Sequence, residues 1–457
     1  MTTVAERLYR AARSVPPAIF GTAIALLLIF RFLAVISRYS VNVLFGDQWD
    51  FLSSFFDHDP TIAELFFWQH GPHREGIGLI ADRFLYQLTA WNVRFECFLI
   101  GGCIIVAMLL ALLLKKRLFG RLEYSDSLIP MIFLTLAQYE TVLITPNPAY
   151  SGFPLLLMML YLLAVLQRND LVRYGLVLII NFLLTFTGFG VFMGVITIGL
   201  FAFACYWSWR GIVTLPLIAP AVGFLIACVS FASFFVRYKF APAVDCFVFP
   251  YHPLVDYPWF VALMFSTFAG LRSPIVLVTI LGAILLGFAL YIFGAGLRRV
   301  ARPDSLGQSP LRHLTHGTRV TIAILLGYSL LYAANTSVGR VCLGLPAPAQ
   351  SSRYTTLLIP AFLAIYFYLL AVPSKKVRDA AMIVLAMVLI PGHVHLSARA
   401  TLFADGKRAW SSCYKQTEDI AACDSARKFK IYPDAERTRL KQKLDYLKKN
   451  KLNLFAE

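Results

Sequence analysis

Apolar runs of about 18 residues or more recur along the whole of this 457-residue chain. Each run is long enough to cross the hydrocarbon core of a bilayer as a helix. The chain is 58% hydrophobic and 15% charged, whereas soluble domains are about 45–50% apolar and about 25% charged. The runs do not alternate as barrel strands would, so helical spans are expected. The sequence therefore predicts an all-α polytopic membrane protein.

We expect about eleven transmembrane helices. Their approximate ranges are 16–37, 96–114, 127–145, 151–167, 171–187, 189–207, 213–235, 274–297, 318–335, 355–372 and 378–396. A further stretch, 257–271, is too short to span comfortably, and we interpret it as re-entrant or interfacial.

The formal net charge of +17 would by itself suggest nucleic-acid binding. Much of the excess, however, lies in short loops beside the apolar runs, where positive residues mark the cytoplasmic side. These residues are Lys115, Lys116, Arg117, Arg168, Arg173, Arg298, Arg299, Lys375, Lys376 and Arg378. With Arg7, Arg10 and Arg13 before the first run, this pattern predicts a cytoplasmic N-terminus and no nucleic-acid partner.

The same alternation places four segments on the outer face: 38–95, 236–273, 336–354 and 397–457. We expect a membrane module over 1–402, with a folded first outer loop at 38–95, and a helical outer tail over 403–457. Lysines and leucines at helical spacing in 438–456 favour a solvated amphipathic helix, although packing on the outer loops is an alternative. Cys413 and Cys423 can pair outside the cytoplasm, whereas the other cysteines resemble ordinary small core residues.

The first outer loop opens with LFGDQWDFL, which carries Asp47 and Asp50 where the chain leaves the lipid. HGPHREG follows at 70–76 and supplies His70, His73, Arg74 and Glu75. Carboxylates at such a boundary suit general acid–base work. The competing interpretation is that Asp47 caps a helix or forms an ion pair, since both arrangements are common. Gly71 and Pro72 between the two histidines disfavour a helical zinc pair.

Three pieces of the chain are similar to bacterial members of the GT-C glycosyltransferase superfamily, which includes protein O-mannosyltransferases and the lipid A aminoarabinose transferase. The pieces are GDQW (46–49) with WQHGPHREG (68–76) and DRFL (82–85), SSRYTTLLIP (351–360), and the outer tail. The motifs cover about a tenth of the chain. Gly71 and Pro72 stand where the family pattern has Asn and Glu, so one acid is missing, and Glu75 is a displaced substitute.

The resemblance implies an inverting transfer of a sugar from a polyprenyl-phosphate donor to a hydroxyl of a glycan, lipid or protein acceptor. Asp47 would be the general base and Asp50 its assistant, at the outer face of a bacterial inner membrane with the C-terminus in the periplasm. Arginines would bind the leaving phosphate: Arg353, next to Tyr354, comes first, Arg340 second, and Arg272, Arg237 and Lys239 are further candidates. His70, His73, Arg74 and Glu75 would bind the substrate. No cofactor or metal is predicted, although a divalent ion is compatible.

Other functions stay open. Eleven spans and outer acids also fit a transporter or a flippase of lipid-linked sugars, but the expected spans carry few acids and no inverted repeat is visible. Glu140, near the outer end of the third span, can face the same cavity as the first loop. A different envelope transferase is a second alternative, either a glycan polymerase or ligase or an acyltransferase that depends on His73. A noncatalytic scaffold is the third. No Walker or dinucleotide glycine loop is present.

Overall fold

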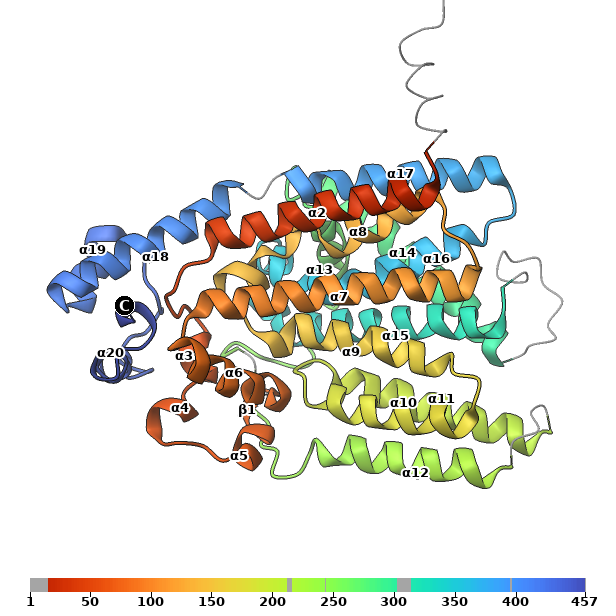
Figure 1. Ribbon diagram of the computed structural model, residues 1–457, viewed down its shortest axis with the longest axis horizontal. Helices are drawn as coiled ribbons and strands as arrows, with labels where there is room; N and C mark the ends of the chain where they lie inside the picture. Colours follow the sequence, from red (N-terminus) through yellow and green to blue (C-terminus); the bar gives the residue numbers. More distant parts are fainter. Residues whose placement is uncertain (1–14, 212–215, 243, 302–313, 395–396, 457) are drawn as a thin grey trace, which may run out of the picture.

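The computed structural model describes residues 15–211, 216–242, 244–301, 314–394 and 397–456. Long helices run side by side in a bundle, and shorter helices form a layer across one end of it (Figure 1). Within the described residues the only sheet is a hairpin of β1 (Gln69–His70) and β2 (His73–Arg74), in which His70 pairs with His73. The predicted all-α membrane class is confirmed at this level.

Seven stretches of the described chain are long and apolar enough to cross a membrane. Four of them are the helices α2 (Pro17–Tyr39), α7 (Val93–Phe119), α11 (Val191–Trp209) and α14 (Ile275–Ala301). The other three are His316–Leu343, which contains α15 (His316–Arg340), Ser352–Leu370, which contains α16 (Ile359–Leu370), and Lys375–Thr417, which begins with α17 (Lys375–Val394). Three more predicted ranges form the shorter helices α9 (Gly152–Val165), α10 (Asp170–Thr185) and α12 (Ile218–Ser233). These shorter helices complete the bundle, but their length alone does not make them spans.

The prediction of one continuous helix over 127–145 is wrong. The chain here forms five short pieces: η1 (Tyr124–Ser127), α8 (Leu128–Phe133), η2 (Leu136–Gln138), the π-helical turn η3 (Glu140–Ile144) and η4 (Pro148–Tyr150). The side-chain amide of Gln138 donates to the carbonyls of Phe133 and Thr135 at the break. It thereby satisfies groups that a continuous helix would pair internally. Interrupted helices of this kind often occur at functional sites.

The stretch 257–271 forms α13 (Asp256–Phe268), which is buried at every position from Phe260 to Phe268. It lies against α14, where Gly282 has no room for a side chain because the backbone of Ala262 is in contact. An interfacial helix would leave one face exposed along its length, so that alternative is wrong. A short helix enclosed by the bundle is what the structure shows.

The end layer combines the first loop with the C-terminal tail (Figure 1). The loop contributes α3 (Gln48–Phe51), α4 (Ser54–Asp57), α5 (Ile62–Phe66) and α6 (Gly76–Thr89), and the tail contributes α18 (Ser397–Thr417), α19 (Ile420–Arg427), α20 (Leu440–Lys449) and η10 (Asn453–Phe455). The tail docks on the loop: Gly46 N donates to Ile431 O at 2.8 Å and Asn453 N to Ala90 O at 2.8 Å. Since Leu440, Leu444 and Leu447 are buried, the solvated-helix prediction is wrong and packing on the outer loop is correct.

Charge and cysteines divide between the two ends of the bundle. The described basic loops lie at the end opposite the first loop and the tail (Figure 1); Arg7, Arg10 and Arg13 lie outside the described residues. Cys413 and Cys423, whose pairing the sequence left open, form a disulfide. A second disulfide, Cys246–Cys342, joins two loops of the same end. The interpretation of these two cysteines as ordinary core residues is therefore wrong.

Candidate active site

A cavity of about 620 Å³ lies where the end layer meets the helical bundle. Its wall comes from segments far apart in the sequence: the first loop, the broken third segment, the 240s loop, the end of α15, the Ser-Arg-Tyr turn η8 (Ser352–Tyr354) and the tail. The lining includes eight residues singled out from the sequence, namely Asp47, Asp50, His70, His73, Glu140, Arg340, Arg353 and Tyr354. Folding thus brings most of the predicted site residues to one place.

Asp47 is positioned by the turn that precedes α3. Gly46 adopts a left-handed backbone conformation with φ of +57°, which glycine tolerates best. One carboxylate oxygen of Asp47, Oδ2, lies 3.3 Å from Nη1 of Arg353, and the side chain is 57% exposed. The described residues show no protein partner for its other oxygen, Oδ1. Asp47 is therefore held by one cation while one oxygen remains accessible from the cavity.

Glu140, at the start of the π-helical turn, fixes the arginine that faces Asp47. Its Oε2 accepts the backbone N–H of Arg353 at 3.0 Å and lies 3.8 Å from Nε of the same residue. The hydroxyl of Ser351 donates to the same oxygen. The expectation that Glu140 faces the cavity of the first loop is confirmed. Because Arg353 lies between two carboxylates, these acids largely balance its charge.

Arg340, the last residue of α15, differs from Arg353 in having no carboxylate partner within the described part of the chain. Among the described residues it forms no ion pair or side-chain hydrogen bond, although it lines the cavity. The neighbouring His73 packs against the ring of Phe189, with centroids 4.3 Å apart. Burial lowers the pKa of His73 to about 3, and the charges of Arg340 and His70 add to the effect. The cavity therefore holds the neutral imidazole of His73 and the guanidinium of Arg340, which forms no ion pair with a described carboxylate.

Asp50 also borders the cavity, but both of its carboxylate oxygens are occupied by the tail. The hydroxyl of Tyr432 donates to Oδ2 at 2.5 Å and that of Thr438 to Oδ1 at 3.0 Å. Among the described residues, Asp50 has these two hydroxyls as its partners and makes no contact with the Asp47 carboxylate, so its predicted role as an assistant to Asp47 gains no support from the geometry. The geometry instead makes Asp50 the link between the first loop and the tail.

Arg74 and Glu75 lie outside the cavity wall. Arg74 is buried and donates to the backbone carbonyls of Phe234, Phe67 and Val236, so it ties the hairpin to the end of α12. Glu75 is fully buried beneath the cavity, where Asn147 donates to its Oε2 at 2.9 Å. Burial raises the pKa of Glu75, and it raises the pKa of Asp82 behind it still further, with Glu75 adding to that effect. Neither Arg74 nor Glu75 is among the residues that line the cavity.

Several cavity residues were not found by sequence reasoning. The additional polar groups are Thr141, Thr145, Asn147, Tyr150, Tyr332 and Arg437. Tyr332 sits within an apolar span and Arg437 within a lysine-rich tail, so neither stands out from its surroundings in the sequence. Arg272, Arg237 and Lys239, the other cations considered for phosphate, do not line this cavity.

The arrangement can do acid–base chemistry next to anion binding. Asp47 can accept a proton from a hydroxyl that enters the cavity, and the Arg340 guanidinium can hold a phosphate oxygen. No group of three His, Cys, Asp or Glu side chains in the described part of the chain is arranged to hold a metal ion.

Comparison with known proteins adds no relative to this picture. No protein-family model, curated protein or solved structure matches the chain. The function is therefore argued from the geometry of the cavity and its surroundings.

Proposed function

We propose that the protein is an inverting glycosyltransferase that moves a sugar from a polyprenyl-phosphate donor to a hydroxyl acceptor. The observation that carries this proposal is the position of Arg340 between a polar cavity and an apolar groove. Arg340 lines the cavity that contains Asp47. Ser337, on the same face of α15 one turn earlier, lines the groove. A lipid phosphate needs this combination, because its head is charged and its tail is apolar.

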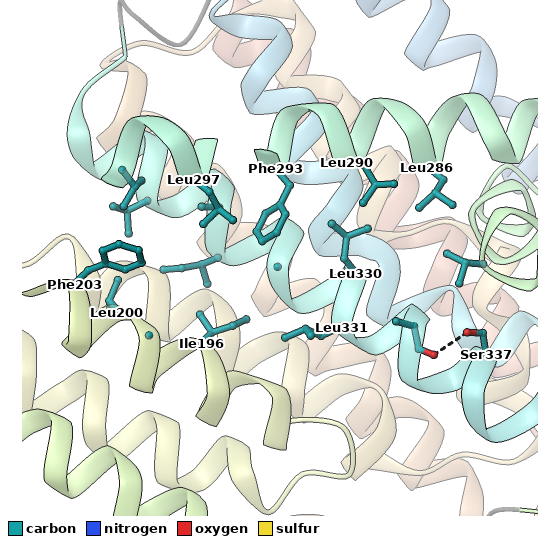
Figure 2. Close-up of a pocket in the computed structure, with 18 of the residues that line it drawn as sticks. Ile196, Leu200, Phe203, Leu286, Leu290, Phe293, Leu297, Leu330, Leu331 and Ser337 are labelled. Carbon is teal, nitrogen blue, oxygen red and sulfur yellow. Dashed lines mark hydrogen bonds between the residues drawn. The ribbon is translucent and has the colours of Figure 1, made fainter. Parts of the chain in front are cut away.

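The groove has a volume of about 630 Å³ and runs along α11, α14 and α15. Figure 2 shows side chains of α14, including Leu286, Leu290 and Phe293, facing Leu330 and Leu331 of α15. Nearly all its lining atoms are apolar, so an isoprenoid chain would lie there without leaving polar groups unpaired. The helices that form the groove also carry exposed apolar side chains, such as Ile284 on α14 and Leu331 on α15. Such side chains fit a groove that opens to the bilayer.

In the proposed reaction Asp47 takes a proton from the acceptor hydroxyl as that oxygen attacks the anomeric carbon. The bond from the anomeric carbon to the phosphate oxygen breaks on the opposite side, and the lipid phosphate leaves with the electron pair. Arg340 stabilises the charge that grows on the phosphate. Arg353 positions Asp47 through their ion pair, and Glu140 shares the same guanidinium. General-base catalysis of this kind contributes about 10²–10⁴-fold to a rate.

Two disulfides support an outer location for the cavity. Cys246–Cys342 and Cys413–Cys423 both lie at the cavity end of the bundle, and structural disulfides persist in oxidising compartments. The basic loops at the other end fit the cytoplasm. We infer that the cavity opens at the outer face of a bacterial inner membrane, with the N-terminus inside.

The proposal is tested in cells that lack the gene. They are complemented with wild type, Asp47→Asn or the control Asp405→Asn at matched protein levels, and lipid-linked sugars and surface glycans are compared by mass spectrometry. We expect the deletion and Asp47→Asn to lose one sugar from a surface glycan and to accumulate the matching lipid-linked sugar. Asp405 pairs with Arg408 on the exposed face of α18, so its variant restores the glycan.

Other outcomes identify the alternatives. Full restoration by Asp47→Asn would contradict the transferase proposal and favour a transporter, a flippase or a scaffold. Loss of an acyl group, with greater dependence on His73 than on Asp47, would favour an acyltransferase. Loss of chain length in the glycan, with its sugars unchanged, would favour a polymerase or ligase.

A further inference from the structure

A second, smaller cavity of about 300 Å³ lies on the other side of the wall formed by η2 and η3. It is bounded by the turn between α13 and α14, by the last residues of α17 and by the first turn of α18. Tyr139 points to this cavity, whereas the next residue, Glu140, lines the cavity of Asp47. The two cavities therefore share a wall but have different linings.

Two guanidinium groups meet in the smaller cavity. Arg272 Nη2 donates to the hydroxyl of Tyr139 at 3.2 Å, and Arg399 Nη1 approaches the same oxygen at 3.5 Å. The Arg272 guanidinium also lies 6.0 Å from the centre of the Tyr139 ring. Gln350 bonds the carbonyl of Arg272 at 3.1 Å and so fixes the turn that carries it. Two like charges are thus held together at a buried tyrosine.

Nothing in the described part of the chain neutralises this pair. Neither arginine forms an ion pair with a described carboxylate, and no acidic side chain lines the cavity. Glu140, which follows Tyr139 in the sequence, and Asp405, which follows Arg399 on α18, have other partners. Glu140 accepts from Ser351 and Arg353, and Asp405 pairs with Arg408 at 3.0 Å. Two guanidiniums held close together without a counter-ion repel each other, so an anion between them would be stabilising.

The backbone adds positive potential at the same place. The 27-residue helix α14 begins at Ile275, three residues after Arg272. The first turn of α18 contributes Ala398 and Arg399 to the lining. The N-terminus of a helix carries unpaired N–H groups and a partial positive charge, which together favour anions.

We propose that this cavity binds the phosphate group of a ligand, and that its surroundings fit the headgroup of a membrane lipid. Arginine forks match phosphate oxygens in geometry and charge. Exposed apolar side chains flank the cavity on both helices, Val276 and Ile280 on α14 and Ile390 and Val394 on α17. A phosphate in the cavity would therefore have its acyl chains beside surfaces that face lipid. This site does not depend on the transferase proposal.

Binding to the purified full chain in detergent tests the site. Native mass spectrometry measures the affinity for dioctanoyl phosphatidic acid, for dioctanoylglycerol, which has the same chains without phosphate, and for inorganic phosphate. The variants are Arg272→Gln with Arg399→Gln, the single variant Arg399→Gln, and a charge-matched control, Arg427→Gln with Lys430→Gln. Arg427 and Lys430 are exposed on the tail, away from both cavities.

We expect the double variant to bind phosphatidic acid at least about tenfold more weakly, as the loss of charged hydrogen bonds predicts. The control variant should bind phosphatidic acid with the same affinity as the wild type. Dioctanoylglycerol should bind to all of these proteins with the same affinity. Arg399 is exposed, so its single variant should fold and show part of the loss. If inorganic phosphate displaces phosphatidic acid at a concentration equal to that of the lipid, free phosphate is the ligand. If displacement needs a far higher concentration of phosphate, the lipid is the ligand. If the double variant and the single variant Arg399→Gln both bind phosphatidic acid as tightly as the wild type, the proposed site is wrong.

Discussion

Arg353 lies between two carboxylates, 3.3 Å from Asp47 and 3.8 Å from Glu140, measured from guanidinium nitrogen to carboxylate oxygen. Asp47 comes from the first loop, Glu140 from the broken third segment and Arg353 from the Ser-Arg-Tyr turn. The two carboxylates neutralise the charge of this arginine, and the arginine contacts only one oxygen of each carboxylate. The accessible oxygen of Asp47 and the unpaired Arg340 then become the reactive features of the cavity.

Replacement of Asp47 with Asn should abolish most transfer while leaving the protein folded. The side chain is 57% exposed, and exposed ion pairs contribute only about 0–1 kcal/mol to stability. Loss of a general base lowers a rate by about 10²–10⁴-fold. Activity in membranes and the melting temperature of purified protein check the two parts. A rate within twofold of wild type would remove Asp47 from the mechanism.

Replacement of Arg340 with Gln should weaken donor use more than acceptor use. Arg340 has no described carboxylate partner, so its removal leaves no unpaired acid and should not lower stability. A hydrogen bond to a charged group is worth about 1.5–3 kcal/mol, so kcat/KM for the lipid-linked donor should fall roughly 10- to 100-fold, because Arg340 is proposed to hold the phosphate as its charge grows. Steady-state kinetics with varied donor and fixed acceptor measure the change. The control is Arg408→Gln, at an exposed arginine of α18 that pairs with Asp405 and donates to the carbonyl of Arg38, away from the cavity.

Asp50 should matter for stability rather than for chemistry. Asp50→Ala removes the acceptors of the hydroxyls of Tyr432 and Thr438 and so loosens the tail from the first loop. We expect a lower melting temperature and faster proteolysis within the tail, whereas Asp47→Ala should show neither change. Tyr432→Phe breaks only one of the two bonds and should give an intermediate effect. Equal melting temperatures for the Asp50 and Asp47 variants would contradict this assignment.

His73 should make the protein less stable in mild acid. Its pKa is about 3 in the folded protein and about 6.5 in an unfolded chain. Between these values the unfolded state binds a proton that the folded state does not, so the free energy of unfolding falls as pH decreases from about 6.5 towards 3. Denaturation of wild type and His73→Asn at pH 7 and pH 4.5 tests this sign. The wild type should lose more stability than the variant, and parallel losses would contradict the prediction.

The two disulfides predict a specific count of reactive thiols. The chain has eight cysteines, of which Cys97, Cys103, Cys205 and Cys228 are free. Protein denatured without reductant should therefore take up four alkyl groups, and protein denatured with reductant should take up eight. Intact mass spectrometry gives both numbers. Eight alkylations without reductant would show that the cavity end does not reside in an oxidising compartment.

The membrane class and the positions of most long helices were predictable from the sequence alone, and Cys413 and Cys423 could be named as a possible pair. These features depend on local information: the length of an apolar run, the spacing of leucines or the nearness of two cysteines. Asp47, His73, Arg340 and Arg353 could be chosen as candidates because they lie in predicted outer segments, and because Asp47, His73 and Arg353 lie in the pieces that resemble GT-C enzymes.

Only the tertiary structure decided which candidates share a cavity and what each one contacts. Asp50 and Asp47 look alike in the sequence, yet only Asp50 meets the hydroxyls of Tyr432 and Thr438, more than 380 residues away. Arg272 and Arg353 likewise both sit beside spans, but they line different cavities. The break at Gln138 and the disulfide between Cys246 and Cys342 also depend on partners that no local pattern reveals. Local composition determines whether a segment enters the membrane, whereas contacts between distant segments determine which charges are paired and which are left for a ligand.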